Sequence, residues 1–253
     1  MSPIRQRLVA SITMGAIALA SAASAASMAK ADVAASVADP ARPAQDRALD
    51  GQRHPAELLA LLKIRAGQTI ADIWPGDYWD RLFATSVGPN GKVYAVHLTE
   101  ADKAEKIVTP PAGAKPIAGY PNVTVVTTQA NTFALPSRAD VIWFRQNYHD
   151  LYHPFMGPSD VPAFNKAVFV ALKPGGLFVV IDHSAPAGST LDTVKTTHRI
   201  DGAIVKSDMA AAGFAFVGES DALRNPADPR TKLVFDASVR GRTDQFVYVF
   251  RRP

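Results

Sequence analysis

The sequence predicts an α/β fold with a mostly parallel sheet, and two observations lead to this prediction. Strand-like runs alternate with helical patterns along most of the chain, and this order is typical of strand–helix–strand units with parallel pairing. The last two strand-like runs, 214–218 and 246–250, have no helix between them. They are therefore expected to form an antiparallel pair at the end of the sheet.

The elements are expected in a regular order. A helical stretch over 45–63 is interrupted at His54-Pro55, where Pro55 can start a new helix because its missing N–H is not needed there. The predicted strands are 69–73, 92–96, 122–126, 140–144, 177–181, 214–218 and 246–250, and the predicted helices are 78–86, 101–107, 162–172 and most of 190–212. Pro89-Asn-Gly91 predicts a turn, and Lys173-Pro-Gly-Gly176 closes one helix.

The N-terminal segment has the pattern of a secretory signal peptide. Arg5 and Arg7 precede an apolar run, and the small residues of Ala23-Ser-Ala25 form a cleavage site. The run is shorter than the roughly 20 residues of a membrane span. We expect residues 1–25 to be a signal peptide cleaved between 25 and 31, 26–43 to be a flexible leader, and 44–253 to be one α/β domain in the periplasm.

Composition excludes several kinds of partner and chemistry. The chain has no cysteine, which excludes disulfides, a thiolate nucleophile and a lipid-attachment cysteine. The formal charge of +4 includes Arg5 and Arg7, and the basic residues are scattered, so nucleic-acid binding gains no support. A small-molecule substrate is expected, with no stable membrane anchor, and the sequence does not indicate an oligomeric state.

Histidines gather at the ends of the predicted strands, where open α/β sheets bind their ligands. His97, His149, His153 and His183 lie at or just after strand ends, and His198 can reach the same edge. Histidine suits proton transfer near neutral pH. His149 is the first candidate and His183 the second.

The residues around these histidines suggest supporting roles. Asp182 can orient a histidine, as carboxylates do in acid–base pairs. Asn147 can cap the turn that follows, with Asp150 at its third position, which leaves His149 exposed toward the pocket with Tyr148 beside it.

Other catalytic chemistries find less support in the sequence. His149 and His153 have helical spacing, but Pro154 disfavours a helix there and no H-E-x-x-H motif is present. No metal site is therefore assigned. A nucleophilic serine is also disfavoured, because the chain lacks a G-x-S-x-G motif.

Several motifs resemble those of one family. They are Arg53-His54-Pro55, Trp74-Pro75-Gly76, Asn147-Tyr148-His149-Asp150, Lys173-Pro-Gly-Gly176, Ile181-Asp182-His183, His198-Arg-Ile-Asp201 and Leu223-Arg-Asn-Pro-Ala-Asp228. With these motifs the chain resembles class I S-adenosylmethionine-dependent methyltransferases, and within them a bacterial family of exported, predicted methyltransferases. The resemblance implies a Rossmann-like fold with a seven-stranded, mostly parallel sheet and a reversed last strand.

The resemblance also implies a cofactor and the residues near it. S-adenosylmethionine would lie over the turn after the first strand, at Asp72, Trp74, Pro75, Gly76 and Asp77, although Trp74 stands where the family's pattern has its first glycine. Further contacts would come from His97 at the second strand and Gln129 at the third. The expected catalytic residues are His149, His183, Asp182, Tyr148, Arg145 and His198.

Three functions remain open from the sequence. The first is methyl transfer from S-adenosylmethionine to a small molecule, with aromatic molecules among the candidates and His149 or His183 as base. The second is a cofactor-independent lyase, isomerase or hydrolase that uses histidine acid–base chemistry. The third is a non-catalytic binder, in which Trp74, Tyr78 and Trp79 stack an aromatic ligand. The long loop 220–244 carries arginines that cover the pocket or form surface salt bridges.

Overall fold

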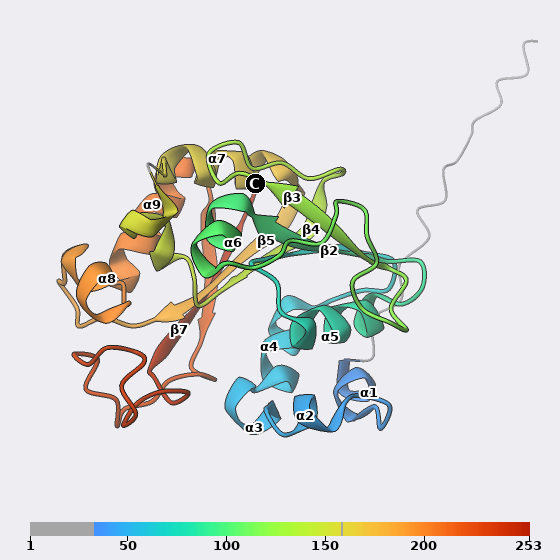
Figure 1. Ribbon diagram of the computed structural model, residues 1–253, viewed down its shortest axis with the longest axis horizontal. Coiled ribbons are helices and arrows are strands. Elements are labelled where there is room, and N and C mark those ends of the chain that lie inside the picture. Colours follow the sequence, from blue (N-terminus) through green and yellow to red (C-terminus); the bar gives the residue numbers. More distant parts are fainter. Residues whose placement is uncertain (1–32, 158) are drawn as a thin grey trace, which may run out of the picture.

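A computed structural model describes residues 33–157 and 159–253 (Figure 1). Its helices are α1 (Val33–Ala38), α2 (Ala44–Arg47), α3 (Asp50–Arg53), α4 (Pro55–Leu62), α5 (Asp77–Val87), α6 (Thr99–Glu105), α7 (Val161–Ala171), α8 (Asp192–Thr197) and α9 (Gly202–Ala212), with 3₁₀ turns η1 (His149–Tyr152) and η2 (Pro154–Met156). Its strands are β1 (Thr69–Ile73), β2 (Lys92–Leu98), β3 (Val123–Thr128), β4 (Ala139–Arg145), β5 (Leu172–His183), β6 (Ala215–Ser220) and β7 (Gln245–Arg251). The predicted signal peptide and its cleavage site lie outside the described residues. Among those residues, no helix is long and apolar enough to cross a membrane.

The strands form one seven-stranded sheet in the order β3-β2-β1-β4-β5-β7-β6. The first five strands in this order are parallel to one another, and β7 runs antiparallel to both β5 and β6. This confirms the predicted Rossmann-like fold with its reversed last strand. The order of the strands reverses between β1 and β4, which is where sheets of this kind bind their ligands.

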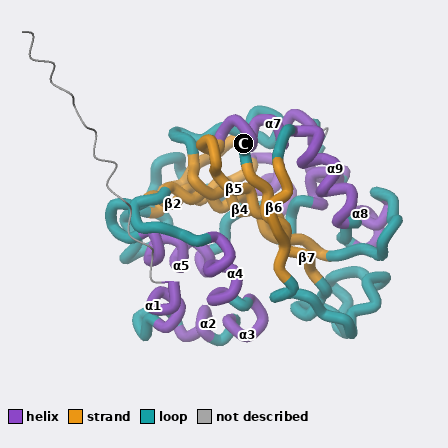
Figure 2. Tube along the Cα trace, turned by 180° about the vertical axis from the view of Figure 1, so that it is seen from behind, coloured by secondary structure: helices purple, strands orange, loops and turns teal. Residues whose placement is uncertain are grey.

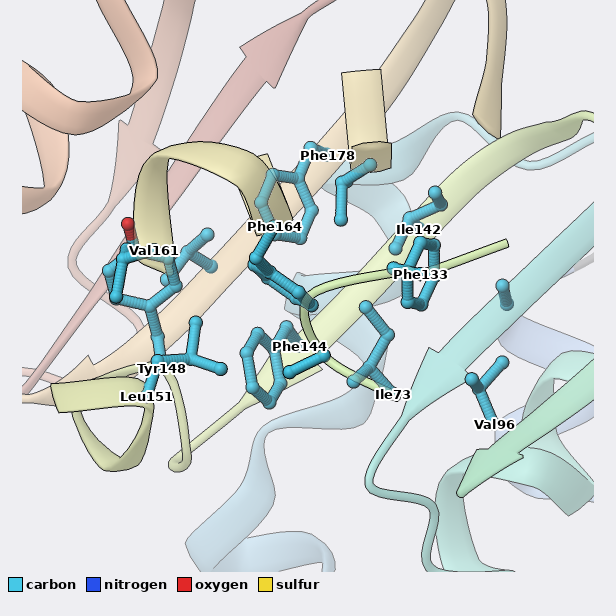
Figure 3. Packing of buried hydrophobic residues seen from close by; sticks show 14 of the residues in the cluster. Ile73, Val96, Phe133, Ile142, Phe144, Tyr148, Leu151, Val161, Phe164 and Phe178 are labelled. Atoms are coloured by element: carbon cyan, nitrogen blue, oxygen red, sulfur yellow. The ribbon is translucent and has the colours of Figure 1, made fainter. Parts of the chain in front are cut away.

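Helices cover both faces of the sheet, because alternate residues of each strand point to opposite sides. On one face Ile142 and Phe144 of β4 join a cluster that includes side chains of α6, α7 and α9 (Figure 3). On the other face Val141 and Trp143 pack with residues of α4 and α5. Seen from behind, α4 and α5 lie on the opposite side of the sheet from α7 and α9 (Figure 2).

The predicted elements match closely, with two local differences. The predicted helix over 190–212 is divided into α8 and α9 by residues 198–201, where His198 has a φ of 52°. This break brings the His198 ring back toward the sheet. Lys173-Pro-Gly-Gly176 does not end a helix in a loop but forms the first part of β5, with a shift of register against β4.

The structure differs more from the prediction in the leader, because residues 33–43 form helix α1 and the turn after it. Helix α1 contacts α4 and α5, and Arg42 in the following turn is only 3% exposed. Its guanidinium donates two hydrogen bonds to Asp50, at 2.9 and 2.7 Å, and a third to the Val37 carbonyl at 2.6 Å. A buried arginine needs such partners, so this segment is part of the domain.

Candidate active site

Two predicted histidines meet at the carboxyl ends of adjacent strands. His149 begins η1, just after β4, and His183 is the last residue of β5. Because β4 and β5 pair in parallel, with Arg145 opposite Ile181, the two rings lie on one edge of the sheet. Their centroids are 6.0 Å apart.

Asp182 fixes this pair of histidines, as its position next to His183 predicts. Its carboxylate lies 2.8 Å from Nδ1 of His149 and also accepts the backbone N–H groups of His149 and His183, both at 2.7 Å. The side chain of Asp182 is fully buried. One carboxylate therefore joins the ends of both strands and sets the orientation of the His149 ring.

The expectation that His149 is exposed is wrong, because only 2% of the residue is accessible. Its turn is a 3₁₀ helix, which directs the ring inward between two carboxylates. Oδ1 of Asp150 lies 3.1 Å from its Nε2. Burial lowers the pKa of His149, but Asp182 and Asp150 outweigh burial and raise it to about 10. At neutral pH this ring carries a positive charge and is not a free base.

His198 completes the group from the junction of α8 and α9. Its Nδ1 lies 3.3 Å from Nε2 of His149 and 3.4 Å from Oδ1 of Asp150. The ring of His153 stacks on His198, with centroids 4.9 Å apart. Four of the predicted histidines thus gather at one edge, as their positions after the strands indicate.

His183 differs from its neighbour in charge. It is partly buried, and its Nδ1 lies 2.7 Å from the Thr243 hydroxyl. Burial and the charge of His149 hold the pKa of His183 well below its ordinary value. A neutral histidine therefore lies beside a positive one, and environments that separate two pKa values in this way assign a base and an acid.

Tyr148 does not belong to the site, contrary to expectation. Its side chain is fully buried and lies among Leu151 and Val161 in the core (Figure 3). The hydroxyl donates to Asp208 at 2.9 Å and accepts from Asn165 at 2.8 Å. The same turn places His149 at the edge of the sheet and directs the Tyr148 side chain toward the helices that cover one face of the sheet.

Arg145, the last residue of β4, lies near the site as predicted. Burial, with the charge of Arg53, lowers its pKa to about 10, and the charges of Asp72, Tyr78 and Asp182 act in the opposite direction. Its Nε is buried and has no hydrogen-bond partner. A cation with an unpaired donor suits an anionic group of a ligand.

The turn after β1 keeps a glycine-like backbone without a glycine at its start. Trp74 has a φ of 60°, which is rare for a bulky residue, and its N–H donates to the Val96 carbonyl at 2.9 Å. Gly76 is exposed, with no atom near the place of an added Cβ. No side chain caps the first turn of α5, which follows. This turn resembles the local anion-binding arrangement of a helix N-terminus.

The acidic side chains of this turn are engaged within the protein. Asp72 is 2% exposed, and burial, with the charge of Asp80, raises its pKa well above the ordinary value. The Asp77 carboxylate accepts from Arg81 at 3.0 Å. Pro75 is partly buried. The open space beside the backbone of Gly76 is therefore the part of the turn that suits a ligand.

Of the two other predicted cofactor contacts, one is engaged elsewhere. Nδ1 of His97 lies 3.1 Å from Asp102, and Gln129 is exposed beside Ala130, whose N–H donates to Glu100 at 3.1 Å. Within residues 33–157 and 159–253, neither His97 nor Gln129 forms a hydrogen bond or ion pair with the histidine group.

Two of the three aromatic residues proposed to stack a ligand belong to the core. The Tyr78 hydroxyl donates to Asp50 at 2.6 Å, and Trp79 lies 4.8 Å from the Trp143 ring, centroid to centroid. Both are 4% exposed. Only Trp74 remains partly accessible, and it makes an edge-on contact with Phe155 at 6.3 Å.

Two arginines of the loop 221–244, Arg224 and Arg230, form salt bridges within the protein. Arg224 and Arg230 contact Asp244 at 3.1 and 3.0 Å. Asp228 accepts two hydrogen bonds from Arg199, at 2.8 and 3.1 Å, and both side chains are fully buried. Of the two alternatives for the loop arginines, these contacts agree with the formation of salt bridges.

Sequence reasoning missed two contributors to the site, Asp150 and Thr243. Asp150 was assigned only a capping role, and its Oδ2 does accept from Asn147 at 3.1 Å, while Oδ1 faces the histidines. An acidic residue directly after a strand-end histidine was the available signal. Thr243 is 60 residues from His183, and no local pattern connects them.

Comparison with solved structures identifies the fold. An S-adenosylmethionine-dependent methyltransferase from Aquifex aeolicus is 18% identical to this protein. The alignment covers 83% of this chain and 98% of the Aquifex chain, with a TM-score of 0.52. One from Mesorhizobium loti is 20% identical over 81% of this chain and 100% of its own, with a TM-score of 0.50. The N-methyltransferase NodS from Bradyrhizobium japonicum is 13% identical, and the alignment covers 83% of this chain and 99% of NodS, with a TM-score of 0.51.

At these identities the similarity shows the fold, and the protein has the fold of class I methyltransferases. No protein-family model matches the chain, and no curated protein matches it. The function must therefore be argued from the site itself.

Proposed function

We propose that this protein is an S-adenosylmethionine-dependent methyltransferase that acts on a small aromatic acceptor. The observation that carries the proposal is the pair of His149 and His183, with ring centroids 6.0 Å apart and both held by Asp182, at the edge where this fold places its ligands. The fold shared with methyltransferases supports the reaction type.

The turn after β1 fits the cofactor on its backbone side. Trp74 adopts the positive φ that a glycine would supply, and the space above Gly76 is open. The uncapped N–H groups of α5 and the Arg145 guanidinium are positive groups that suit a carboxylate. These residues would hold S-adenosylmethionine, which supplies an electrophilic methyl group when bound.

A chain of aromatic rings leads from this turn to the histidines and suits a flat acceptor. Trp74 contacts Phe155, Phe155 lies 4.6 Å from His153, and His153 stacks on His198. Phe235 of the long loop approaches His198 to 5.3 Å and is 57% exposed. Exposed aromatic rings beside polar groups favour a ligand that stacks.

His183, His149 and Asp182 have different roles in proton transfer. Thr243 engages Nδ1 of His183, so Nε2 is the atom that takes the proton from the acceptor's hydroxyl or amino group. The charge on His149 stabilises the negative charge that develops on the acceptor. Asp182 keeps both strand ends in place during the step.

Calorimetry tests the cofactor, and a labelling assay tests the reaction. We expect the purified protein to bind S-adenosylmethionine and S-adenosylhomocysteine with micromolar affinity. With methyl-labelled S-adenosylmethionine and a panel of phenols and aromatic amines, label should pass to at least one acceptor. No heat with either compound would reject the proposal and favour cofactor-independent histidine chemistry.

Trp74 provides a second test of the cofactor site. We expect Trp74→Gly to weaken S-adenosylmethionine binding by about 2–10-fold, because one aromatic contact is lost, while the backbone turn is kept. Lys63→Gly is the matched control, since Lys63 also has a positive φ, 49°, but lies after α4. Tighter binding in Trp74→Gly would instead mean that the indole blocks the cofactor.

We also propose that the protein is exported to the periplasm. The charged, apolar and small-residue order of residues 1–25 supports this. Mass spectrometry of the periplasmic fraction should find a mature N-terminus between Ala26 and Asp32. Intact Met1 in protein recovered from the cytosol would contradict export.

A further inference from the structure

We propose that His149, Asp150 and His198 form a binding site for a divalent transition-metal ion. Their donor atoms are Nε2 of His149, Oδ1 of Asp150 and Nδ1 of His198, and the three separations are 3.1, 3.3 and 3.4 Å. The atoms thus lie at the corners of a nearly equilateral triangle. Donors bound to one zinc ion at roughly 2.0–2.2 Å in tetrahedral geometry have about this spacing.

The Asp150 carboxylate points to a cation at the centre of this triangle. Its side chain is 7% exposed. One oxygen, Oδ2, is engaged by Asn147, and the other, Oδ1, lies 3.1 and 3.4 Å from the two imidazole nitrogens but makes no well-aligned hydrogen bond. A buried carboxylate oxygen without a well-aligned hydrogen bond costs free energy, and an ion between Asp150 and the two imidazoles would satisfy it.

Asp182 prepares His149 to act as a ligand. It accepts a hydrogen bond from Nδ1–H of His149 at 2.8 Å, so the lone pair of the neutral ring lies on Nε2, toward the triangle. Metal-bound histidines usually have such a carboxylate behind them, and it fixes both the tautomer and the ring orientation. Bound metal would replace the proton on Nε2 and keep a positive charge beside His183.

His198 supplies the third ligand from a strained position. Its φ of 52° costs about 1–3 kcal/mol in a non-glycine residue unless the structure requires it. The ring is 20% exposed, which gives an entry path for the ion. Two histidines and one carboxylate on one side of an ion leave its other positions open, as in catalytic zinc and non-haem iron sites. The acceptor's oxygen or nitrogen could then bind the ion next to His183.

The test is metal binding, which needs neither a methyl donor nor an acceptor. Tag-free protein treated with a chelator and then dialysed is titrated with Zn²⁺ by calorimetry, and with Co²⁺ by visible absorption. We expect one ion per chain with micromolar affinity or better, and a Co²⁺ spectrum of low coordination number. Asp150→Asn and His198→Ala should each weaken Zn²⁺ binding at least 100-fold.

Two further variants make the result specific. Asp182→Asn should weaken Zn²⁺ binding by about 10–100-fold, which is the usual effect of removing a partner behind a ligand. His54→Ala is the matched control, because His54 is a partly exposed histidine outside the site, with its Nδ1 3.1 Å from Glu57. This variant should bind Zn²⁺ as the wild type does.

Thermal melts separate loss of the site from loss of the fold. If Asp150→Asn does not fold, His198→Ala decides, because that ring is partly exposed. Failure of the folded wild type to bind Zn²⁺ and Co²⁺, or equal binding by His198→Ala, would overturn the metal site. Either result would leave the proposed methyl transfer to be judged by its own assays.

Discussion

Replacing His183 with glutamine lowers the rate of methyl transfer by about 10²–10⁴-fold, which is the contribution of one positioned general base. The substitution keeps a polar side chain beside Thr243, so the fold should be retained. The rate is measured with the acceptor found by label transfer, at saturating S-adenosylmethionine. His54→Gln serves as the control, since His54 lies before α4, outside the site, with its Nδ1 3.1 Å from Glu57.

The pH profile makes this prediction specific to proton transfer. Burial and the charge of His149 lower the pKa of His183, so the base stays unprotonated below the ordinary histidine pKa of about 6.5. The acid limb of kcat/KM should therefore lie below pH 6.5 in the wild type and disappear in His183→Gln. A wild-type rate in His183→Gln would remove His183 from the mechanism.

Replacing Arg199 with methionine lowers the free energy of unfolding by about 3–5 kcal/mol, because the buried carboxylate of Asp228 loses its partner. Arg199 is fully buried and also donates to the carbonyls of Ser184 and Lys232, at 3.1 and 2.8 Å. It thus connects the end of β5 with the loop 221–244.

Chemical denaturation of the two single variants and the double variant measures this effect. Asp228→Asn should also destabilise the protein, and Arg199→Met/Asp228→Asn should cost less than the sum of the single changes, because the two side chains interact directly. Arg240→Met is the control, since Arg240 is exposed in the same loop. A change below about 0.5 kcal/mol in Arg199→Met, the range of ordinary surface substitutions, would show that the pair does not hold the loop.

The sheet could be predicted from sequence because its signals are local. β1 begins and ends at the predicted residues, Thr69 and Ile73, and strand ends placed His149, Asp182 and His183 together. Buried hydrophobic runs, turn residues and helix breaks can each be recognised within a few neighbouring residues. The parallel pairing of β4 and β5 then aligns the ends of both strands.

The remaining features depend on contacts between distant residues. The inward direction of His149 and Tyr148 follows from the 3₁₀ geometry of η1, which residue spacing does not specify. The order of residues 33–43 depends on Arg42 reaching Asp50, and a composition rich in alanine, serine and proline gives no sign of it. The triangle at Asp150 needs His198, which lies 48 residues further along the chain.

The position of β7 determines when this site can form during synthesis. β7 lies between β5 and β6, and the residues just before it hold both His183, through Thr243, and the backbone of Ser184, whose N–H donates to the Asp244 carbonyl at 2.9 Å. Along the chain, these residues come after every histidine of the site. The histidines therefore stay unassembled until β7 is in place, and a protein that ends before Gln245 has every histidine of the site but not the strand that fixes their positions.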